Sequence, residues 1–270
     1  MKTQEFANKV VAVTGGASGI GAAICRRFAQ AGADIALLDV DGEGAQALAR
    51  DLEGGGARAL WLRCDVSREE ECRDAIGAIL RSFGGIDVLV NNAGITQRSA
   101  FVDTQIGVFR KVMDVNFFGS LCCTQAAIAS LLERRGLVIA IESIAGVAPL
   151  LGRSGYCASK HALHGLFTTL RAELRGAGVG VMIVCPGFVR TNLQTRALGG
   201  DGRVTAHPQS TVGKQISPEE VAEAVYRGAR RRKGLVLLTP VGILTYWLSR
   251  IAPLSYERLM ARQLRAELQR

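Results

Sequence analysis

A tyrosine and a lysine stand four residues apart in the stretch SGYCASKHAL, residues 154–163. On a helix, positions i and i+4 lie on one face about one turn apart, so Tyr156 and Lys160 could bring their polar ends together. An ammonium beside a phenol stabilises the phenolate, which makes such a pair suited to moving a proton. Whether this place is an active site depends on the elements around it.

A glycine-rich turn near the N-terminus could hold a phosphate group. The stretch TGGASGIG, residues 14–21, follows an apolar strand and opens a helix, with the spacing GxxxGxG. A dinucleotide pyrophosphate binds where such a turn meets a helix N-terminus, because glycines allow a tight turn and close backbone approach. Alone, this turn could also be purely structural. The residues expected to contact a dinucleotide here are Gly15, Ser18, Gly19, Ile20 and Gly21.

Two aspartates after the next strands extend this prediction. Asp39 lies 18 residues past Gly21, where an acidic side chain can accept hydrogen bonds from the adenosine ribose and would repel a 2′-phosphate. No arginine or lysine occupies position 17, 18 or 40, so the sequence favours NAD over NADP. Asp65 and Val66 follow the third strand, where Asp65 could meet the adenine amino group or cap the helix that begins near Ser67.

Apolar runs of strand length alternate with segments of helical period, which is the pattern of a parallel sheet built from βαβ units. The predicted strands cover 10–15, 34–39, 59–65, 86–94, 137–143, 180–187 and 235–240. The predicted helices between them cover 20–32, 44–53, 68–83 and 218–232. Most strands are rich in Val, Ile and Leu throughout, as expected when both faces are buried. We therefore predict one α/β domain with seven parallel strands over residues 1–240, followed by an extension over 241–270.

Several separate motifs occur in one order along this chain: the glycine-rich turn, NNAG at 91–94, Asn116, Ser143, YCASK at 156–160 and PG at 186–187. Through these motifs and their spacings, the chain resembles the short-chain dehydrogenase/reductase family over about residues 8–240. Neither YxxxK nor the glycine-rich turn alone would justify the match. The resemblance implies a doubly wound Rossmann-type fold, a nicotinamide cofactor, and hydride transfer between that cofactor and a hydroxyl or carbonyl carbon.

The resemblance also implies a role for four residues. Tyr156 would be the general acid in ketone reduction and the general base in alcohol oxidation. Lys160 would lower the pKa of the phenol and hold the nicotinamide ribose. Ser143, at the end of the fifth strand, would hydrogen-bond the substrate oxygen as its charge changes. Asn116 would hold a water chain on the side of the lysine.

The cofactor crevice would be completed by residues after the fourth and sixth strands, since ligands of open α/β sheets bind beyond the carboxyl ends of the strands. Asn91 would lie near the adenosine side, and Thr191 is placed to bind the nicotinamide carboxamide. The remaining cofactor contacts implied by the resemblance are Asn92, Ala93, Gly94, Tyr156, Lys160, Pro186, Gly187 and Val189.

The composition is that of a soluble globular protein, with 48% hydrophobic and 21% charged residues. Seven cysteines form no CxxC pair, so the sequence suggests neither a disulfide framework nor a metal site. The N-terminus lacks the apolar region of a signal peptide, which predicts a cytoplasmic protein. Of the net charge of +9, residues 227–270 carry +8. The preceding part is nearly neutral, which argues against nucleic-acid binding. His161, His164 and His207 are expected to be structural or exposed.

Two segments bear on the substrate. Residues 190–217 carry several glycines and little apolar periodicity, as expected of a mobile loop, and this region is the substrate lid in the family. The segment 144–155 is apolar apart from Arg153 and Ser154. It favours an apolar secondary alcohol or ketone, such as a steroid, a lipid or a small carbonyl compound.

The extension has an unusual composition, because residues 234–249 hold no charged residue. This run is shorter than the roughly 20 apolar residues of a membrane span, and it contains Pro240. It could pack on the domain or on a partner subunit. Alternatively, residues 243–254, with Tyr246, Trp247 and flanking arginines, could rest on an anionic membrane surface. Pairing of long helices near 104–132 and 156–175, usual in the family, predicts a homodimer or homotetramer.

The first functional hypothesis is therefore an NAD(H)-dependent alcohol dehydrogenase or ketone reductase. An NAD(H)-binding sensor or regulatory protein that acts through a partner is the alternative from another class. An epimerase or dehydratase that uses NAD transiently is a third possibility. The complete proton-transfer set argues against the sensor, because a sensor has no need of a proton donor.

Overall fold

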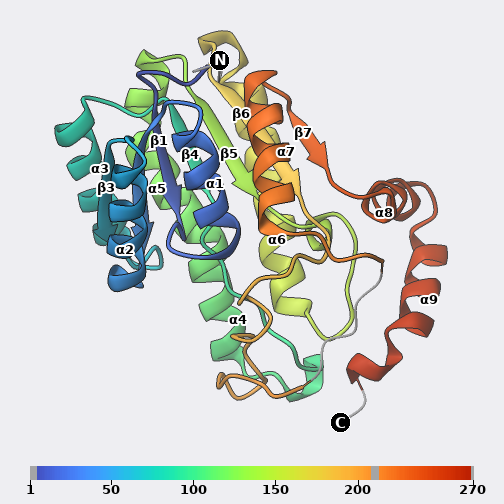
Figure 1. Cartoon of the computed structure of the whole chain (residues 1–270). Helices are drawn as coiled ribbons and strands as arrows, with labels where there is room; N and C mark the ends of the chain where they lie inside the picture. Colours follow the sequence, from blue (N-terminus) through green and yellow to red (C-terminus); the bar gives the residue numbers. More distant parts are fainter. Residues whose placement is uncertain (1–4, 208–212, 269–270) are drawn as a thin grey trace.

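The computed structural model describes residues 5–207 and 213–268. Within them, seven parallel strands form one sheet in the order β3-β2-β1-β4-β5-β6-β7 (Figure 1). The strands are β1 (Val10–Thr14), β2 (Asp34–Asp39), β3 (Ala59–Arg63), β4 (Val88–Asn91), β5 (Leu137–Ile141), β6 (Gly180–Cys185) and β7 (Leu235–Leu237). The strand order reverses between β1 and β4, so the sheet is doubly wound. The predicted α/β fold with a seven-stranded parallel sheet is confirmed.

Helices cover both faces of this sheet through two apolar clusters. The helices on one face are α1 (Gly19–Ala29), α2 (Gly42–Gly54) and α7 (Pro218–Arg230). Those on the other face are α3 (Glu69–Phe83), α5 (Gly119–Glu133) and α6 (Ser154–Glu173). In β1, Val11 and Val13 belong to the first cluster, whereas Val10 and Ala12 belong to the second. Successive side chains of a strand point to opposite faces, so burial of both faces explains the continuous apolar runs.

Every strand except β2 is shorter than predicted, and β3, β4 and β7 show where the shortening matters. β3, β4 and β7 end at Arg63, Asn91 and Leu237, whereas the apolar pattern extended them to 65, 94 and 240. The chain turns out of the sheet at these points, and residues such as Asp65, Gly94 and Thr239 line a cavity instead. The strand ends therefore differ from the prediction where the site begins.

A long helix, 106–133, runs through α4 (Ile106–Met113), a π turn (Asp114–Phe118) and α5. By length and composition alone, this stretch could cross a membrane, with a mean hydropathy of 1.5. However, α5 packs under the sheet through the second apolar cluster, and the π turn carries the buried polar residue Asn116. We therefore interpret it as a core helix.

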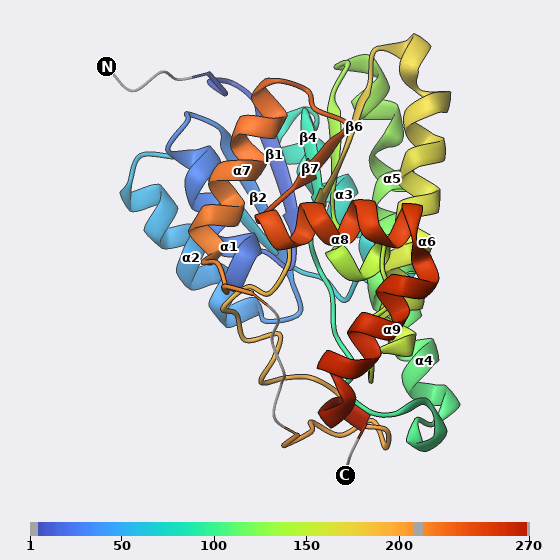
Figure 2. The ribbon, with the colours of Figure 1, turned by 90° about the vertical axis from the view of Figure 1, so that its right-hand side faces the viewer.

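The extension folds into α8 (Pro240–Ile251) and α9 (Pro253–Gln263). Thr239, between β7 and α8, has a φ of 70°, which is rare for a β-branched residue, and its hydroxyl accepts the Gly242 N–H at 3.1 Å. The extension contacts the segment 144–155: Ser249 Oγ donates to the Val147 carbonyl at 3.1 Å, and the short 3₁₀ helix η3 (Ile144–Gly146) contacts α8. Figure 2 shows α8 and α9 on the side of the molecule that carries α6.

Candidate active site

Loops after the carboxyl ends of the strands enclose a cavity of about 600 Å³, at the edge where ligands bind in open α/β sheets. The predicted site residues that line it are Gly15, Ser18, Gly19, Ile20, Asp39, Asp65, Val66, Asn92, Ala93, Gly94, Ser143, Tyr156, Lys160, Pro186, Gly187, Val189 and Thr191. Gly21 and Asn116 lie behind its wall. The structure thus brings together residues from every motif that the sequence singled out.

The glycine-rich turn leaves the start of α1 open to the cavity. Gly15 and Gly19 have φ values of 62° and 53°, which favour glycine because a Cβ is strained there. In the described residues, no side chain caps α1 and no acidic residue lies in its first turn, so the helix N-terminus can attract an anion. A Cβ on Gly21 would collide with the Gly15 carbonyl. Gly21 therefore shapes the turn without lining the cavity.

Asp39 is fixed at the cavity wall by backbone hydrogen bonds. Its Oδ2 accepts the Ala17 N–H at 2.9 Å and its Oδ1 accepts the Asp41 N–H at 3.0 Å. A carboxylate can accept about four hydrogen bonds. Asp39 thus keeps acceptor capacity for the two hydroxyls of a ribose.

The end of β4 is tied to the glycine-rich turn. Asn92 Nδ2 donates to the carbonyl oxygens of Thr14 and Gly15, both at 2.9 Å, and Thr14 Oγ1 accepts the Asn92 N–H at 3.0 Å. Asn91 does not lie at the adenosine side as predicted. It is the last residue of β4, and its buried amide donates to Thr124 Oγ1 on α5 at 2.9 Å, because alternate side chains of a strand face opposite sides.

Asp65 takes the position of a turn cap. Its Oδ1 accepts hydrogen bonds from the Ser67 N–H at 3.0 Å and from the Ser67 hydroxyl at 2.7 Å. Asp65 and Val66 also line the cavity. Asp65 does not cap the helix as the alternative predicted, because α3 begins at Glu69 without a side-chain cap, and a contact with adenine stays a prediction.

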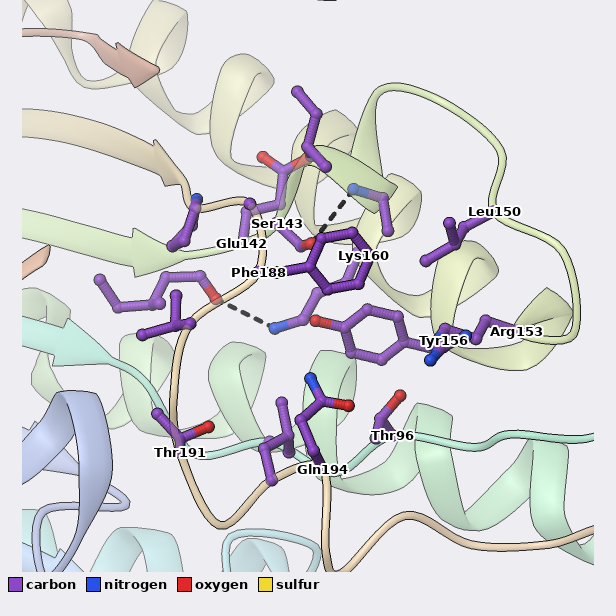
Figure 3. Close-up of a pocket in the computed structure, with 18 of the residues that line it drawn as sticks. Thr96, Glu142, Ser143, Leu150, Arg153, Tyr156, Lys160, Phe188, Thr191 and Gln194 are labelled. Carbon is purple, nitrogen blue, oxygen red and sulfur yellow. Dashed lines mark hydrogen bonds between the residues drawn. The ribbon is translucent and has the colours of Figure 1, made fainter. Parts of the chain in front are cut away.

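Tyr156 and Lys160 project from one face of α6 beside Ser143 (Figure 3). The Lys160 Nζ atom lies 5.8 Å from the centroid of the Tyr156 ring. Burial raises the pKa of Tyr156 to about 12, although a hydrogen bond with Ser143 opposes this effect. Desolvation of the phenolate is the largest effect on this pKa, and a lowering of it by Lys160 stays a prediction.

Lys160 is buried, and its pKa lies close to neutral pH. Its Nζ donates to the Ile141 carbonyl at 3.0 Å. Burial lowers the pKa of Lys160 to about 8, and the charge of Glu142 opposes this effect. Lys160 is therefore a cation at neutral pH and loses its proton about one unit above it.

Asn116 sits in the π turn, a feature that often occurs at functional sites. Its Oδ1 accepts the Ile95 N–H at 2.8 Å, and its Nδ2 donates to the Ile95 carbonyl at 3.0 Å and to Ser159 Oγ at 2.9 Å. A Cβ on Gly94 would lie 3.2 Å from this Oδ1 and 3.7 Å from Lys160 Nζ. Asn116 thus braces the loop next to the lysine, and its role in a water chain stays a prediction.

The extension forms the wall at the substrate end of the cavity, which the sequence reasoning missed. The lining residues from α8 are Val241, Gly242, Leu244, Thr245 and Leu248, and those from α9 and just after it are Tyr256, Leu259, Met260, Gln263 and Leu264. Both sets follow the three- and four-residue spacing of one helical face. This periodicity was the signal available in the sequence, although it does not reveal what the face covers.

The segment 190–217 contributes Thr191, Leu193, Gln194, Arg196 and Lys214 to the lining. Its middle is anchored: the Leu198 N–H donates to the Thr96 carbonyl at 2.9 Å and the Arg98 N–H donates to the Leu198 carbonyl at 2.7 Å. Residues 208–212 of the predicted lid lie outside the described part of the chain. Motion of the segment stays a prediction.

The segment 144–155 supplies an apolar wall with one charge. Ala148, Pro149 and Leu150 line the cavity together with Arg153, and Arg153 is only 3% exposed. The positive charge of Arg153 favours the phenolate of Tyr156. The charge in this wall therefore faces the proton-transfer group, and the remainder of the wall is apolar.

Taken together, these features fit a nicotinamide dinucleotide. The open start of α1 suits a pyrophosphate, Asp39 suits a ribose, and the cavity continues from them to Tyr156 and Lys160. The glycine-rich turn leaves space that side chains would fill. A Cβ on Gly19, for example, would lie within 3.3 Å of Thr191.

Comparisons with known proteins agree with this geometry. Residues 9–199 match the family model described as short chain dehydrogenase. The protein named dehydrogenase/reductase SDR family member 7B from Bos taurus is 36% identical over 96% of this chain and 82% of its own length. A protein of Drosophila melanogaster, dehydrogenase/reductase SDR family protein 7-like, is 30% identical over 97% of this chain and 83% of its own length.

Solved structures show the same fold. A short chain dehydrogenase/reductase from Burkholderia phymatum in complex with NAD superposes with a TM-score of 0.82, at 26% identity, over 91% of this chain and 94% of that one. An alcohol dehydrogenase from Thermococcus sibiricus complexed with 5-hydroxy-NADP gives a TM-score of 0.72, at 26% identity, over 84% of this chain and 93% of that one. The chain belongs to the short-chain dehydrogenase/reductase family of NAD(P)-dependent oxidoreductases.

Proposed function

We propose that the protein moves a hydride between NAD(H) and an apolar secondary alcohol or ketone. The observation that carries the proposal is a single cavity with Asp39 at its cofactor end, Ser143 and Tyr156 in its middle, and apolar side chains of α8 and α9 at its other end. The two solved relatives held NAD and an NADP derivative, so the preference for NAD rests on Asp39.

The residues of the chain supply binding and proton transfer, and a bound nicotinamide supplies or accepts the hydride. In ketone reduction, the Tyr156 hydroxyl donates its proton to the substrate oxygen, which Ser143 also hydrogen-bonds. Lys160 stabilises the phenolate that remains. With its pKa at about 12, Tyr156 carries its proton at neutral pH, which is the state that reduction needs. Alcohol oxidation needs the phenolate, so its rate should rise with pH.

The experiment that tests this function follows nicotinamide absorbance with the purified protein, NAD(H) or NADP(H), and a panel from short ketones to steroids and hydroxy lipids. NAD(H) turnover with an apolar member of the panel, and little turnover with NADP(H), would support the proposal. Tight NADH binding without turnover of any member would favour the sensor instead.

A substitution in the wall from α9 should change substrate size preference. Met260 is buried and lines the cavity, so Met260→Trp places a larger side chain in the substrate space. We expect the KM for large apolar substrates to rise about tenfold, equivalent to about 1.4 kcal/mol, whereas NADH affinity stays unchanged. Leu254→Trp on the exposed side of α9 is the control. Equal effects on small and large substrates would contradict the assigned wall.

The outer side of the extension suits the surface of an anionic membrane, which we propose as a peripheral contact. Ile243, Trp247 and Ile251 are spaced four residues apart on α8 and are 44%, 55% and 77% exposed, and Arg258 and Arg262 are exposed on α9. An exposed apolar stripe beside cations is the pattern of an interfacial helix. It would place the substrate cavity next to a reservoir of apolar substrates.

Co-sedimentation with anionic liposomes tests this contact. We expect binding at low salt, reduced by Trp247→Ser, and unchanged by the control Trp61→Ser, which alters a partly exposed tryptophan of β3 far along the sheet. Absence of binding at low salt would rule out the membrane contact. A second copy of the chain would then be the preferred occupant of the stripe, and the mass of the protein in solution would show whether it forms the predicted homodimer or homotetramer.

A further inference from the structure

A buried carboxylate lies directly behind the proton-transfer residues. Glu142 follows the last residue of β5 and precedes Ser143, and its side chain is 0% exposed. A Cβ on Gly146 would collide with Glu142 Oε1, so this glycine makes room for the carboxylate. Burying a charge costs free energy unless opposite charges or hydrogen bonds compensate. The groups around Glu142 therefore indicate which role a charge at this position has.

His164 and Arg250 hold this carboxylate. Glu142 Oε2 lies 3.1 Å from His164 Nδ1, and His164 Nε2 lies 3.3 Å from Arg250 Nη2. A guanidinium has only N–H donors, so the Nε2 atom accepts from Arg250. The Nδ1 atom then carries the ring proton and donates it to Glu142. His164, expected to be structural or exposed, is thus partly buried and fixed in one tautomer between α8 and the end of β5.

The charge of this carboxylate acts on the Lys160 ammonium. Lys160 and His164 are one turn apart on α6, and the Lys160 ammonium donates to the carbonyl of Ile141, the residue before Glu142. The charge of Glu142 favours the protonated lysine against the effect of burial. A negative charge in this place thus acts on a group that the reaction uses.

The other ionisable groups around this pair are Tyr156 on α6, Cys185 at the end of β6 and Arg250 on α8. Cys185 Sγ donates to Glu142 Oε2 at 3.7 Å. Burial raises the pKa of Cys185 and that of Tyr156, so both are neutral at neutral pH. Among these described neighbours, Cys185 and Tyr156 therefore supply no negative charge beside Lys160.

We propose that Glu142, held by His164 and Arg250, is a positioning residue that keeps the side chain of Lys160 in place as a cation. Glu142 acts through Lys160 and not on the substrate. The inference rests on the proposed function, because it gives Lys160 a part in proton transfer and cofactor binding.

The test is the pH dependence of Glu142→Gln, which keeps the size of the side chain and an acceptor for His164 but removes the charge. NADH affinity and kcat for ketone reduction are measured from about pH 6 to about pH 9. Because Tyr156 keeps its proton over this range, the decline with rising pH reports Lys160, near pH 8 in the wild type. We expect the midpoint of this decline to fall by about one pH unit or more in Glu142→Gln, which corresponds to at least tenfold weaker proton binding by Lys160.

Two histidine variants complete the design. His164→Ala should shift the midpoint in the same direction, because Glu142 loses the donor that holds it. His161→Ala is the matched control, since the Nδ1 atom of His161 contacts the Cys157 carbonyl within its own helix at 2.9 Å. We expect its midpoint to stay at the wild-type value. If Glu142→Gln does not fold, as judged by circular dichroism, His164→Ala provides the measurement.

A wild-type midpoint in Glu142→Gln would overturn the inference, whether activity is retained or is lost equally at every pH. Failure of the proposed function looks different. In that case the wild type binds NADH without reducing any ketone, and the pH dependence of NADH binding alone still tests whether Glu142 acts on Lys160.

Discussion

Replacing Tyr156 with phenylalanine should lower turnover by about 10²–10⁴-fold, the usual contribution of a general acid. The substitution removes only the hydroxyl, so the ring stays packed in the cavity and NADH should bind nearly as tightly as in the wild type. Steady-state turnover and NADH fluorescence titration measure the two quantities separately. Turnover near that of the wild type would show that another group supplies the proton.

A second tyrosine of the same cavity provides the control. Tyr256 on α9 lines the cavity, and its hydroxyl donates to the Pro149 carbonyl at 3.3 Å. Tyr256→Phe removes the same atom at the substrate end, where no proton transfer is assigned. We expect at most a few-fold change in turnover, because a neutral hydrogen bond is worth only about 1 kcal/mol.

Replacing Asp39 with serine should reverse the cofactor preference. Hydrogen bonds to a charged group are worth about 1.5–3 kcal/mol, so loss of the carboxylate should weaken NAD(H) binding by about 10–100-fold. NADP(H) should bind more tightly, because repulsion of the 2′-phosphate disappears and the charge of Arg63, the register partner of position 39 on β3, is no longer opposed by the carboxylate. The ratio of kcat/KM for the two cofactors measures the change.

Asp41→Ser is the control for this prediction. Asp41 Oδ1 accepts the Gly44 N–H at 2.9 Å at the start of α2, and serine is also a good cap. The cofactor preference should therefore stay as in the wild type. A wild type that already used NADP(H) as well as NAD(H) would contradict the role given to Asp39.

The sheet and the cofactor end of the cavity could be predicted because both depend on local signals. Apolar runs mark strands buried on two faces, and the residues just after them must meet at one edge of a parallel sheet. Asp39, Gly15 and Gly19 therefore reached the cavity as predicted. Asn91 did not, because one step along a strand reverses the direction of the side chain.

The substrate end was harder to predict because it depends on contacts between distant segments. The apolar face of α8 and α9 was visible as periodicity, but the sequence does not say that Leu248 and Met260 would line the same cavity as Leu150. Similarly, Glu142 reads as an ordinary residue beside Ser143. Its significance appears only when α6 and α8 bring His164 and Arg250 to it.

The position of α8 and α9 after all seven strands has a consequence for synthesis of the protein. A chain emerging from the ribosome folds its N-terminal parts first. The strands and the glycine-rich turn, which build the cofactor end of the cavity, are exposed before the wall that closes the substrate end. A nascent chain whose first 239 residues have emerged from the ribosome should therefore already retain a nicotinamide nucleotide, whereas selection among substrates has to wait until the two final helices have docked.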